Sequence, residues 1–363
     1  MRAIQLDTDC EGPLALNDNA FELCRDFLKP DGDKFFQQVN HYDDCLADIL
    51  KRPGYQAGNT LKLILPFLKA YGLTNAAIQD YSLKTVMLVP GAAKAYRLLH
   101  SLNFPIFAIS TSYCQFAQAV GSKLGFDPTR IFCAELDLDR YPLPPEEEAA
   151  LRRWKDEIVS APEIDLPPGA TSLEELPQPL QEAIARLDQI FKELIPQMRL
   201  GVIYQEVHPL GAAEKARALS ESLKVTGIGL ADTIYVGDSI TDVEALEAVR
   251  GGGGLSISFN GNADAVQAAE VIVVADTAWP MALLSVVFRD WGKEGVLELA
   301  TRGRPQHSRS LVLPEAVIEP IARGLHGHRF NLYQSKVPNL DEVARESTAM
   351  RAQLRGAAIA ALG

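Results

Sequence analysis

The sequence predicts an α/β fold built on a doubly wound, Rossmann-like parallel sheet. Short apolar runs alternate along the chain with longer stretches that have helical spacing of apolar residues, which is typical of βαβ units. The run at 271–275 (VIVVA) contains no polar residue, as expected of a strand that is covered on both faces. In chain order, the expected strands are residues 3–6, 105–110, 130–134, 233–237, 255–259 and 271–275.

Two long segments interrupt this alternation. Residues 16–87 and 134–207 are both mainly helical in pattern, and both are too long to be loops of a compact domain. We interpret them as two helical caps inserted into one core, which comprises residues 1–15, 88–133 and 208–275. Residues 276–363 show no further strand pattern and are expected to form a helical C-terminal extension.

Composition limits the classes of function. The 363 residues include 35 basic and 47 acidic side chains, a net charge of −12, which argues against non-specific binding to nucleic acid or anionic membranes. The apolar stretches are far shorter than the roughly 20 residues that span a bilayer. The five cysteines form no CxxC pair, so we expect neither a disulfide framework nor a structural zinc site. These features favour a cytoplasmic protein.

Carboxylates follow two of the expected strands. In AIQLDTDCEGP, Asp7 and Asp9 come directly after the first apolar run and point the same way if the backbone is extended. In IYVGDSITDVEAL, Asp238 and Asp242 come after another such run, where a helix begins. Each pattern alone also fits a solvated or capped turn. Because parallel sheets bind ligands at the carboxyl ends of their strands, we expect the four acids to share one crevice.

Other polar residues occupy comparable positions. Ser110 and Thr111 end the strand expected at 105–110, where a hydroxyl group binds a phosphoryl oxygen or caps a helix. Lys215 lies on an expected helix, 238 − 215 = 23 residues before the second acidic motif. Asn260 and Asn262 follow the strand expected at 255–259, and fit a substrate contact or a turn equally well.

The order of these motifs resembles that of the haloacid dehalogenase-like (HAD) superfamily: DxD, a strand ending in serine, a lysine, then GDSITD. The segment DCEGP followed by NDNAFEL is similar to an archaeal, hydrogenase-associated subgroup. The resemblance covers the core and implies an Mg²⁺-dependent phosphatase that hydrolyses a small phosphorylated metabolite through an aspartyl-phosphate. Two alternatives keep the same fold: a phosphomutase, and a non-catalytic regulatory or assembly subunit.

The resemblance also implies a role for each acid. Asp7 matches the nucleophile, and Asp9 matches the general acid and base. Asp7, the main-chain carbonyl of Asp9 and Asp238 match the Mg²⁺ ligands, with Asp242 acting through water. A carboxylate that approaches a phosphate meets repulsion of about 4 kcal/mol per unit-charge pair at 4 Å and an effective dielectric constant near 20. The divalent cation would offset this repulsion.

The remaining roles concern phosphate binding. Ser110, with Thr111 beside it, and Lys215 match the phosphate-binding hydroxyl and ammonium groups. The family usually follows DxD with Gly-Thr, whereas this chain has Cys10 and Glu11. Glu11 therefore brings a further carboxylate close to the expected metal.

Overall fold

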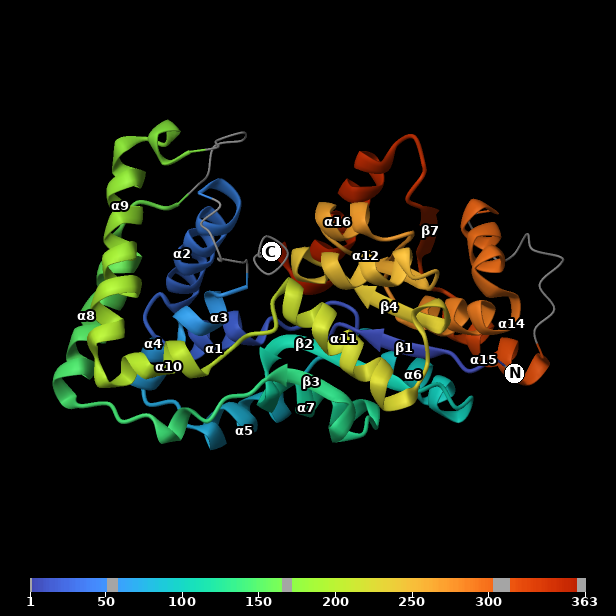
Figure 1. Cartoon of the computed structure of the whole chain (residues 1–363), viewed down its shortest axis with the longest axis horizontal. Coiled ribbons are helices and arrows are strands. Elements are labelled where there is room, and N and C mark those ends of the chain that lie inside the picture. Colours follow the sequence, from blue (N-terminus) through green and yellow to red (C-terminus); the bar gives the residue numbers. More distant parts are fainter. Residues whose placement is uncertain (1, 51–57, 165–171, 303–313, 358–363) are drawn as a thin grey trace.

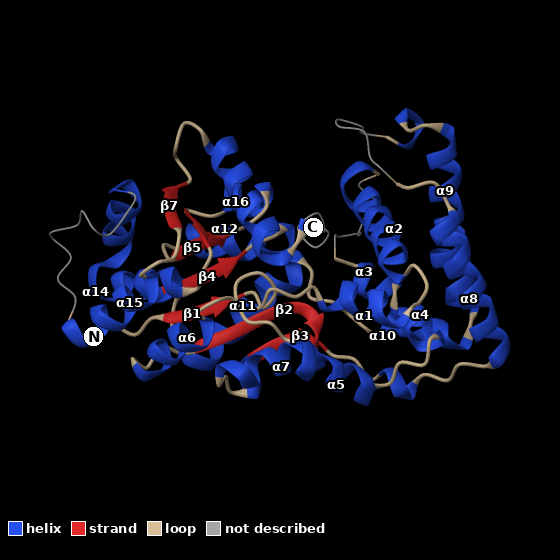
Figure 2. Cartoon of the chain, turned by 180° about the vertical axis from the view of Figure 1, so that it is seen from behind, coloured by secondary structure: helices blue, strands red, loops and turns tan. Residues whose placement is uncertain are grey.

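A seven-stranded sheet forms the centre of the computed structural model, which describes residues 2–50, 58–164, 172–302 and 314–357. The strand order is β3-β2-β1-β4-β5-β6-β7, and all neighbours are parallel except β6 and β7 (Figures 1 and 2). The strands are Gln5–Thr8 (β1), Ile106–Tyr113 (β2), Ile131–Ala134 (β3), Thr233–Gly237 (β4), Leu255–Phe259 (β5), Val271–Ala275 (β6) and Phe330–Gln334 (β7).

Helices cover both faces of this sheet. Against one face pack α6 (Ala92–Ser101), α7 (Cys114–Leu124), α14 (Trp279–Arg302) and α15 (Glu315–Leu325). Against the other pack α11 (Ala212–Thr226), α12 (Val243–Gly251), α13 (Ala263–Ala268) and α16 (Leu340–Arg355). The predicted doubly wound α/β fold is therefore confirmed. In the described ranges, no helix combines the length and apolar character needed to cross a bilayer.

Strand β1 ends two residues later than predicted. Gln5 and Asp7 are polar, yet both are fully buried within the strand. Gln5 Nε2 donates to Ser222 Oγ of α11 at 2.8 Å, and Thr226 Oγ1 donates to Gln5 Oε1 at 2.5 Å, so a tertiary contact satisfies the polar side chain. The carboxyl end of β1 consequently lies beside Asp9.

The two helical insertions pack together beside the sheet (Figure 1). Residues 16–87 contribute α1 (Asn19–Phe27), α2 (Gly32–Asp44), α3 (Thr60–Leu63), α4 (Leu65–Ala70) and α5 (Asn75–Thr85). Residues 134–207 contribute α8 (Pro145–Ser160), α9 (Gln178–Asp188) and α10 (Ile203–Glu206). Their apolar side chains share one buried cluster, in which Phe67 of the first insertion contacts Phe191 of the second. The boundaries of core and caps stay predictions.

The C-terminal region is not purely helical, so that expectation was wrong. Strand β7 pairs antiparallel with β6 along its whole length, from Val271 opposite Gln334 to Ala275 opposite Phe330. The segment FNLYQ alternates over only five residues, with Phe330 and Leu332 buried, and so short a pattern does not by itself predict a strand.

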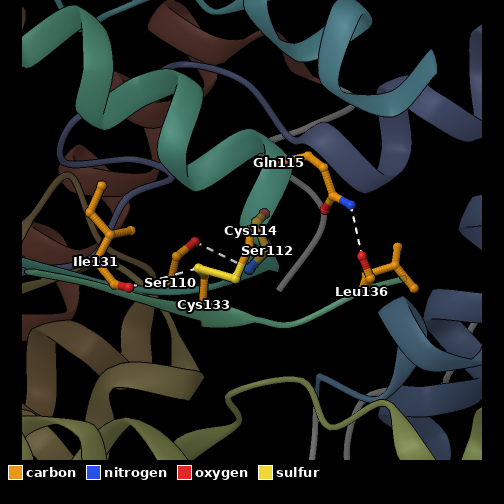
Figure 3. The surroundings of a disulfide bond; sticks show 7 residues. All are labelled: Ser110, Ser112, Cys114, Gln115, Ile131, Cys133 and Leu136. Atoms are coloured by element: carbon orange, nitrogen blue, oxygen red, sulfur yellow. Dashed lines mark hydrogen bonds between the residues drawn. A yellow bond between two sulfur atoms is a disulfide. The ribbon is translucent and has the colours of Figure 1, made fainter. Parts of the chain in front are cut away.

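The sequence predicted no disulfide framework, yet two of the cysteines are paired. Cys114 and Cys133 form a disulfide with Cα atoms 5.0 Å apart, close to Ser110, which lies within β2 because that strand continues to Tyr113 rather than ending at residue 110 (Figure 3). Cys114 directly follows β2 and Cys133 lies in β3, and the pairing of Tyr113 with Ala134 brings the two cysteines together. Spacing along the sequence does not reveal such a contact between neighbouring strands.

Candidate active site

Three buried carboxylates meet where β1 and β4 end. Asp9 follows β1, Asp238 follows β4, and Asp242 ends the short turn that leads into α12. Each offers one oxygen, and these oxygens lie within 4.8 Å of one another. Burial raises the pKa of Asp9 well above its ordinary value, and the neighbouring Asp242 raises it further. Such a cluster needs cations to remain ionised.

Lys215 on α11 supplies one cation. Its Nζ donates to Asp9 Oδ2 at 2.7 Å and to Asp242 Oδ1 at 2.8 Å, and its side chain is fully buried. Burial acts to lower the pKa of Lys215, but the two carboxylates outweigh it and the pKa is raised. The ammonium group therefore stays charged between the two acids.

Asp242 fixes the turn that carries Asp238. Its Oδ1 also accepts from the Tyr235 hydroxyl at 2.9 Å, and its Oδ2 accepts from the main-chain N–H groups of Asp238 at 3.1 Å and Ser239 at 3.2 Å. Gly237 permits this approach, because a Cβ there would lie 2.4 Å from the Asp242 Cβ. Several donors therefore hold the Asp242 carboxylate in place, and Asp242 in turn fixes the position of Asp238.

Asp7 lies outside this cluster, contrary to the expected crevice. Its Oδ2 accepts from Gln5 Nε2 at 2.7 Å and faces Ser222, which follows Lys215 by seven residues, or about 10 Å, along α11. Its Oδ1 has no hydrogen-bond partner among the described residues. Burial raises the pKa of Asp7 to about 7, although the Gln5 and Ser222 side chains oppose the rise.

Glu11 lies on the wall of the cavity that Asp9 also lines. Its Oε1 accepts from the main-chain N–H of Asn19 at 2.7 Å. Desolvation, assisted by the charge of Asp18, raises the pKa of Glu11 to about 8. The chain then turns at Gly12, with φ of +95°, where a Cβ would lie 2.1 Å from Asp238 Oδ2. Only glycine allows the backbone to pass so close to that carboxylate.

The cavity holds about 110 Å³ and joins the core to the caps. Pockets for drug-sized ligands commonly hold roughly 300–1,000 Å³, so the space suits a small ligand. The core contributes Asp9, Glu11, Thr111 and Asp238, the first insertion contributes Phe36, Asn40, Thr60 and Leu61, and the C-terminal helix contributes Arg351 and Arg355. Several chain segments therefore surround one small polar space.

The two candidate hydroxyl groups differ in position. Thr111 lines the cavity, and its Oγ1 donates to the main-chain carbonyl of Leu210 at 3.0 Å. Ser110 is buried and does not line the cavity; its Oγ accepts from the N–H of Ser112 at 3.2 Å and lies beside the Cys10 thiol. Thr111 is therefore the better placed of the two to contact a ligand.

The two candidate asparagines make structural contacts. Asn260 Nδ2 donates to the carbonyl of Ala275 at 2.8 Å, and its Oδ1 accepts from the N–H of the same residue at 2.9 Å, which ties the end of β5 to β6. Asn262 caps α13 by accepting from the N–H of Ala265 at 3.0 Å. Neither residue lines the cavity.

Two arginines of α16 also contact the site, and the sequence motifs did not identify them. Arg351 Nη1 donates to Asp238 Oδ2 at 2.9 Å, and Arg355 Nη1 donates to the same oxygen at 3.2 Å. Their spacing of four residues predicts a shared helix face. Nothing local in LDEVARESTAMRAQLRG, however, indicates that this face docks against the acidic cluster.

The oxygen-rich donor set fits a hard divalent cation such as Mg²⁺. Asp9 and Asp238 line the cavity, and their oxygens are close enough to share one ion. Burial raises the pKa of the Asp238 carboxyl despite the two arginines, which indicates that bound positive charge would stabilise its ionised form.

Comparison with known proteins places the chain in a family. No protein-family model matches the sequence, and no curated protein matches it significantly. Among solved structures, gene product AF1437 from Archaeoglobus fulgidus is 30% identical, with a TM-score of 0.79 over 99% of each chain. The chain belongs to the AF1437 family. That name states no activity.

Structures of phosphoserine phosphatase also match this AF1437-family protein, at much lower similarity. A substrate-bound complex is 15% identical with a TM-score of 0.46, covering 75% of this chain and 93% of that one. A phospho-aspartyl intermediate analogue is 13% identical with a TM-score of 0.43, again covering 75% and 93%.

Proposed function

We propose that this AF1437-family protein is an Mg²⁺-dependent phosphatase of the HAD-like superfamily, which hydrolyses a small phosphomonoester through an aspartyl-phosphate at Asp9. The observation that supports it most is the buried pairing of Lys215 with Asp9 and Asp242 beside a cavity that Asp238 also lines. The proposal moves the nucleophile from Asp7, which the sequence suggested, to Asp9.

The two-residue shift also brings the motif closer to the family pattern. The reactive pair becomes Asp9 and Glu11, and Gly12 follows directly, as a glycine follows the second acid in the family pattern. Glu11 then takes the position of the second aspartate, and Pro13 stands where the family usually has threonine. The shift matches the observed end of β1, two residues later than predicted.

In the first step, an Asp9 carboxylate oxygen attacks phosphorus and the bond to the leaving oxygen breaks. Glu11 donates its proton to that oxygen, and the alcohol departs. A pKa of about 8 keeps Glu11 protonated at neutral pH, as a general acid requires. Lys215 holds Asp9 in one orientation and keeps positive charge beside the group being transferred.

In the second step, Glu11 takes a proton from water, and the water oxygen attacks phosphorus. The bond from phosphorus to Asp9 breaks, which releases phosphate and regenerates the Asp9 carboxylate. Thr111 borders the same space, and its hydroxyl would donate to a phosphoryl oxygen in place of the Leu210 carbonyl. Asp9 and Asp238 would hold the Mg²⁺ ion, which supplies positive charge that offsets the repulsion between carboxylate and phosphate.

The size of the cavity supports a small substrate. Its 110 Å³ leaves little room beyond the phosphoryl group, and the side chains of Phe36, Asn40 and Leu61 limit the leaving group on the cap side. We therefore expect activity on phosphorylated metabolites of a few carbon atoms.

The experiment compares Asp9→Asn with Asp7→Asn in phosphate release from a panel of small alkyl phosphomonoesters, with and without Mg²⁺. The wild type should be active only with the cation, and Asp9→Asn should lose roughly 10³-fold or more in kcat because the nucleophile is absent. Asp7→Asn should stay within about threefold, since its side chain faces Gln5 and Ser222. Equal activity in wild type and Asp9→Asn, at equal folding by circular dichroism, would refute the proposal.

A further inference from the structure

Helix α16 reaches the candidate site from the far end of the chain. Its buried polar residues Ser347, Arg351 and Arg355 are spaced by four and share one face of the helix. Ser347 Oγ donates to the carbonyl of Gly261 at 2.7 Å, after β5. Arg355 donates to the carbonyls of residues 16 and 17, at 3.1 and 2.7 Å, after β1.

The two arginines converge on one carboxylate. Arg351 Nη1 donates to both the main-chain oxygen and Oδ2 of Asp238, each at 2.9 Å, and Arg355 Nη1 reaches Oδ2 at 3.2 Å. Both arginine side chains are only 5% exposed. Asp18 also faces both guanidinium groups, so the two arginines join Asp238 and Asp18 in one buried cluster that borders the cavity.

The charges around the cavity indicate a role for the two arginines. Six carboxyl groups line the described part of the cavity, belonging to Asp9, Glu11, Asp18, Asp43, Asp44 and Asp238, and Glu11 among them is the proton donor of the proposed reaction. Arg351 and Arg355 are the two cationic side chains in that lining. An acidic cavity attracts a divalent cation but repels a phosphate dianion. Anion binding therefore needs cations that border the space.

We propose that Arg351 and Arg355 are phosphate-binding residues of this site and that their charge also limits its affinity for the divalent cation. This rests on the proposed phosphatase function and adds two substrate-binding residues to it. Guanidinium groups suit the role because their planar N–H donors match phosphoryl oxygens. A bound divalent cation would neutralise part of the Asp238 charge. The two arginines would then carry a net positive charge that attracts the phosphate.

A charge role and a purely structural role predict different outcomes. When a guanidinium is replaced by a neutral amide, a charge role predicts tighter Mg²⁺ binding and weaker phosphate binding, since the two ligands have opposite charge. If the arginines only anchored the helix, the substitution would lower the melting temperature and leave the dissociation constants for Mg²⁺ and phosphate unchanged. Lysine keeps the charge, and should therefore preserve both affinities.

The experiment is calorimetric titration of the full chain, first with Mg²⁺ and then, at saturating Mg²⁺, with inorganic phosphate. We expect Arg351→Gln and Arg355→Gln each to lower the Kd for Mg²⁺ about tenfold and to raise the Kd for phosphate about tenfold. Arg351→Lys and Arg355→Lys should remain within about threefold of wild type. The matched control is Arg345→Gln, which removes an exposed charge from the same helix and should change neither constant.

Unchanged phosphate affinity in both glutamine variants would overturn the inference, as would equal changes in Arg345→Gln or no phosphate binding by the wild type. If Arg351→Gln does not fold, Arg355→Gln decides alone. Binding requires no turnover, so the two proposals fail separately. Arginine-dependent phosphate binding without hydrolysis would refute only the proposed function, and hydrolysis with arginine-independent phosphate affinity would refute only this inference.

Discussion

Asp7 and Asp9 lie two residues apart and face the same helix, yet their surroundings differ. Asp9 contacts the Lys215 ammonium group and borders the cavity, whereas Asp7 contacts the amide of Gln5 and faces the hydroxyl of Ser222. Both carboxyls have raised pKa values because both are buried. The comparison teaches that the chemistry of a buried acid depends on the group opposite it, and that a DxD pattern alone does not identify the reactive member.

Glu11 lies two residues after Asp9 and has a third role, that of the proton donor. Glu11→Gln keeps the size of the side chain but cannot donate a proton, so kcat should fall roughly 10²- to 10⁴-fold. The kcat of the wild type should decline as pH rises through about 8, because Glu11 loses its proton there. A bound cation would lower the pKa of Glu11 and so move this alkaline decline in kcat to lower pH. A glutamine variant with wild-type kcat and the same alkaline limb would contradict this role.

Asp7 should influence stability rather than activity. Its pKa is raised from 3.8 to about 7, so the folded state favours the protonated carboxyl. That stabilisation is fully present below pH 3.8 and is lost as pH rises towards about 7, at roughly 1.4 kcal/mol per pH unit. Asp7→Asn cannot ionise and should remove this dependence.

Urea unfolding of the metal-free protein between pH 4 and 8 measures the effect. Asp7→Asn should gain stability relative to wild type with each unit of rising pH, up to about pH 7. Parallel curves for the two proteins across this range would show that Asp7 is ionised in the folded state, and the contrast with Asp9 would lose its basis.

Asn260 provides the smallest expected effect, at a position outside the cavity. Asn260→Ala removes two buried hydrogen bonds to Ala275 and should cost about 1–3 kcal/mol of stability. Because Asn260 does not line the cavity, KM and kcat should be unchanged. A higher KM with wild-type stability would instead restore the substrate contact suggested by the sequence.

The carboxyl ends of β4 and β1 differed in how well the sequence predicted them. Strand β4 has the predicted bounds, because an uninterrupted apolar run leads directly into Gly237 and Asp238. Strand β1 carries the polar residues Gln5 and Asp7 on its face towards α11, and only the contacts with that helix explain why they are buried. The error of two residues in β1 carried directly into the assignment of the nucleophile.

Local sequence patterns did not predict the C-terminal part of the site. A helix with Arg351 and Arg355 on one face is ordinarily solvated, and the hydrogen bonds of α16 to the core join residues that are 86 to 339 positions apart. Strand β7 likewise gains its structure from pairing with β6. The core motifs could be predicted because each lies at the end of its own strand or helix, whereas these elements depend on long-range packing.

The central claim is that phosphate is transferred to Asp9, and the most direct measurement identifies the phosphorylated residue. The protein is mixed with a substrate and Mg²⁺, quenched during turnover, and reduced with borohydride, which converts an aspartyl-phosphate into homoserine. Mass spectrometry of the N-terminal peptide should then locate homoserine at position 9 and leave Asp7 unmodified. Homoserine at position 7, or none at position 9 in an enzyme that is turning over, would contradict the account.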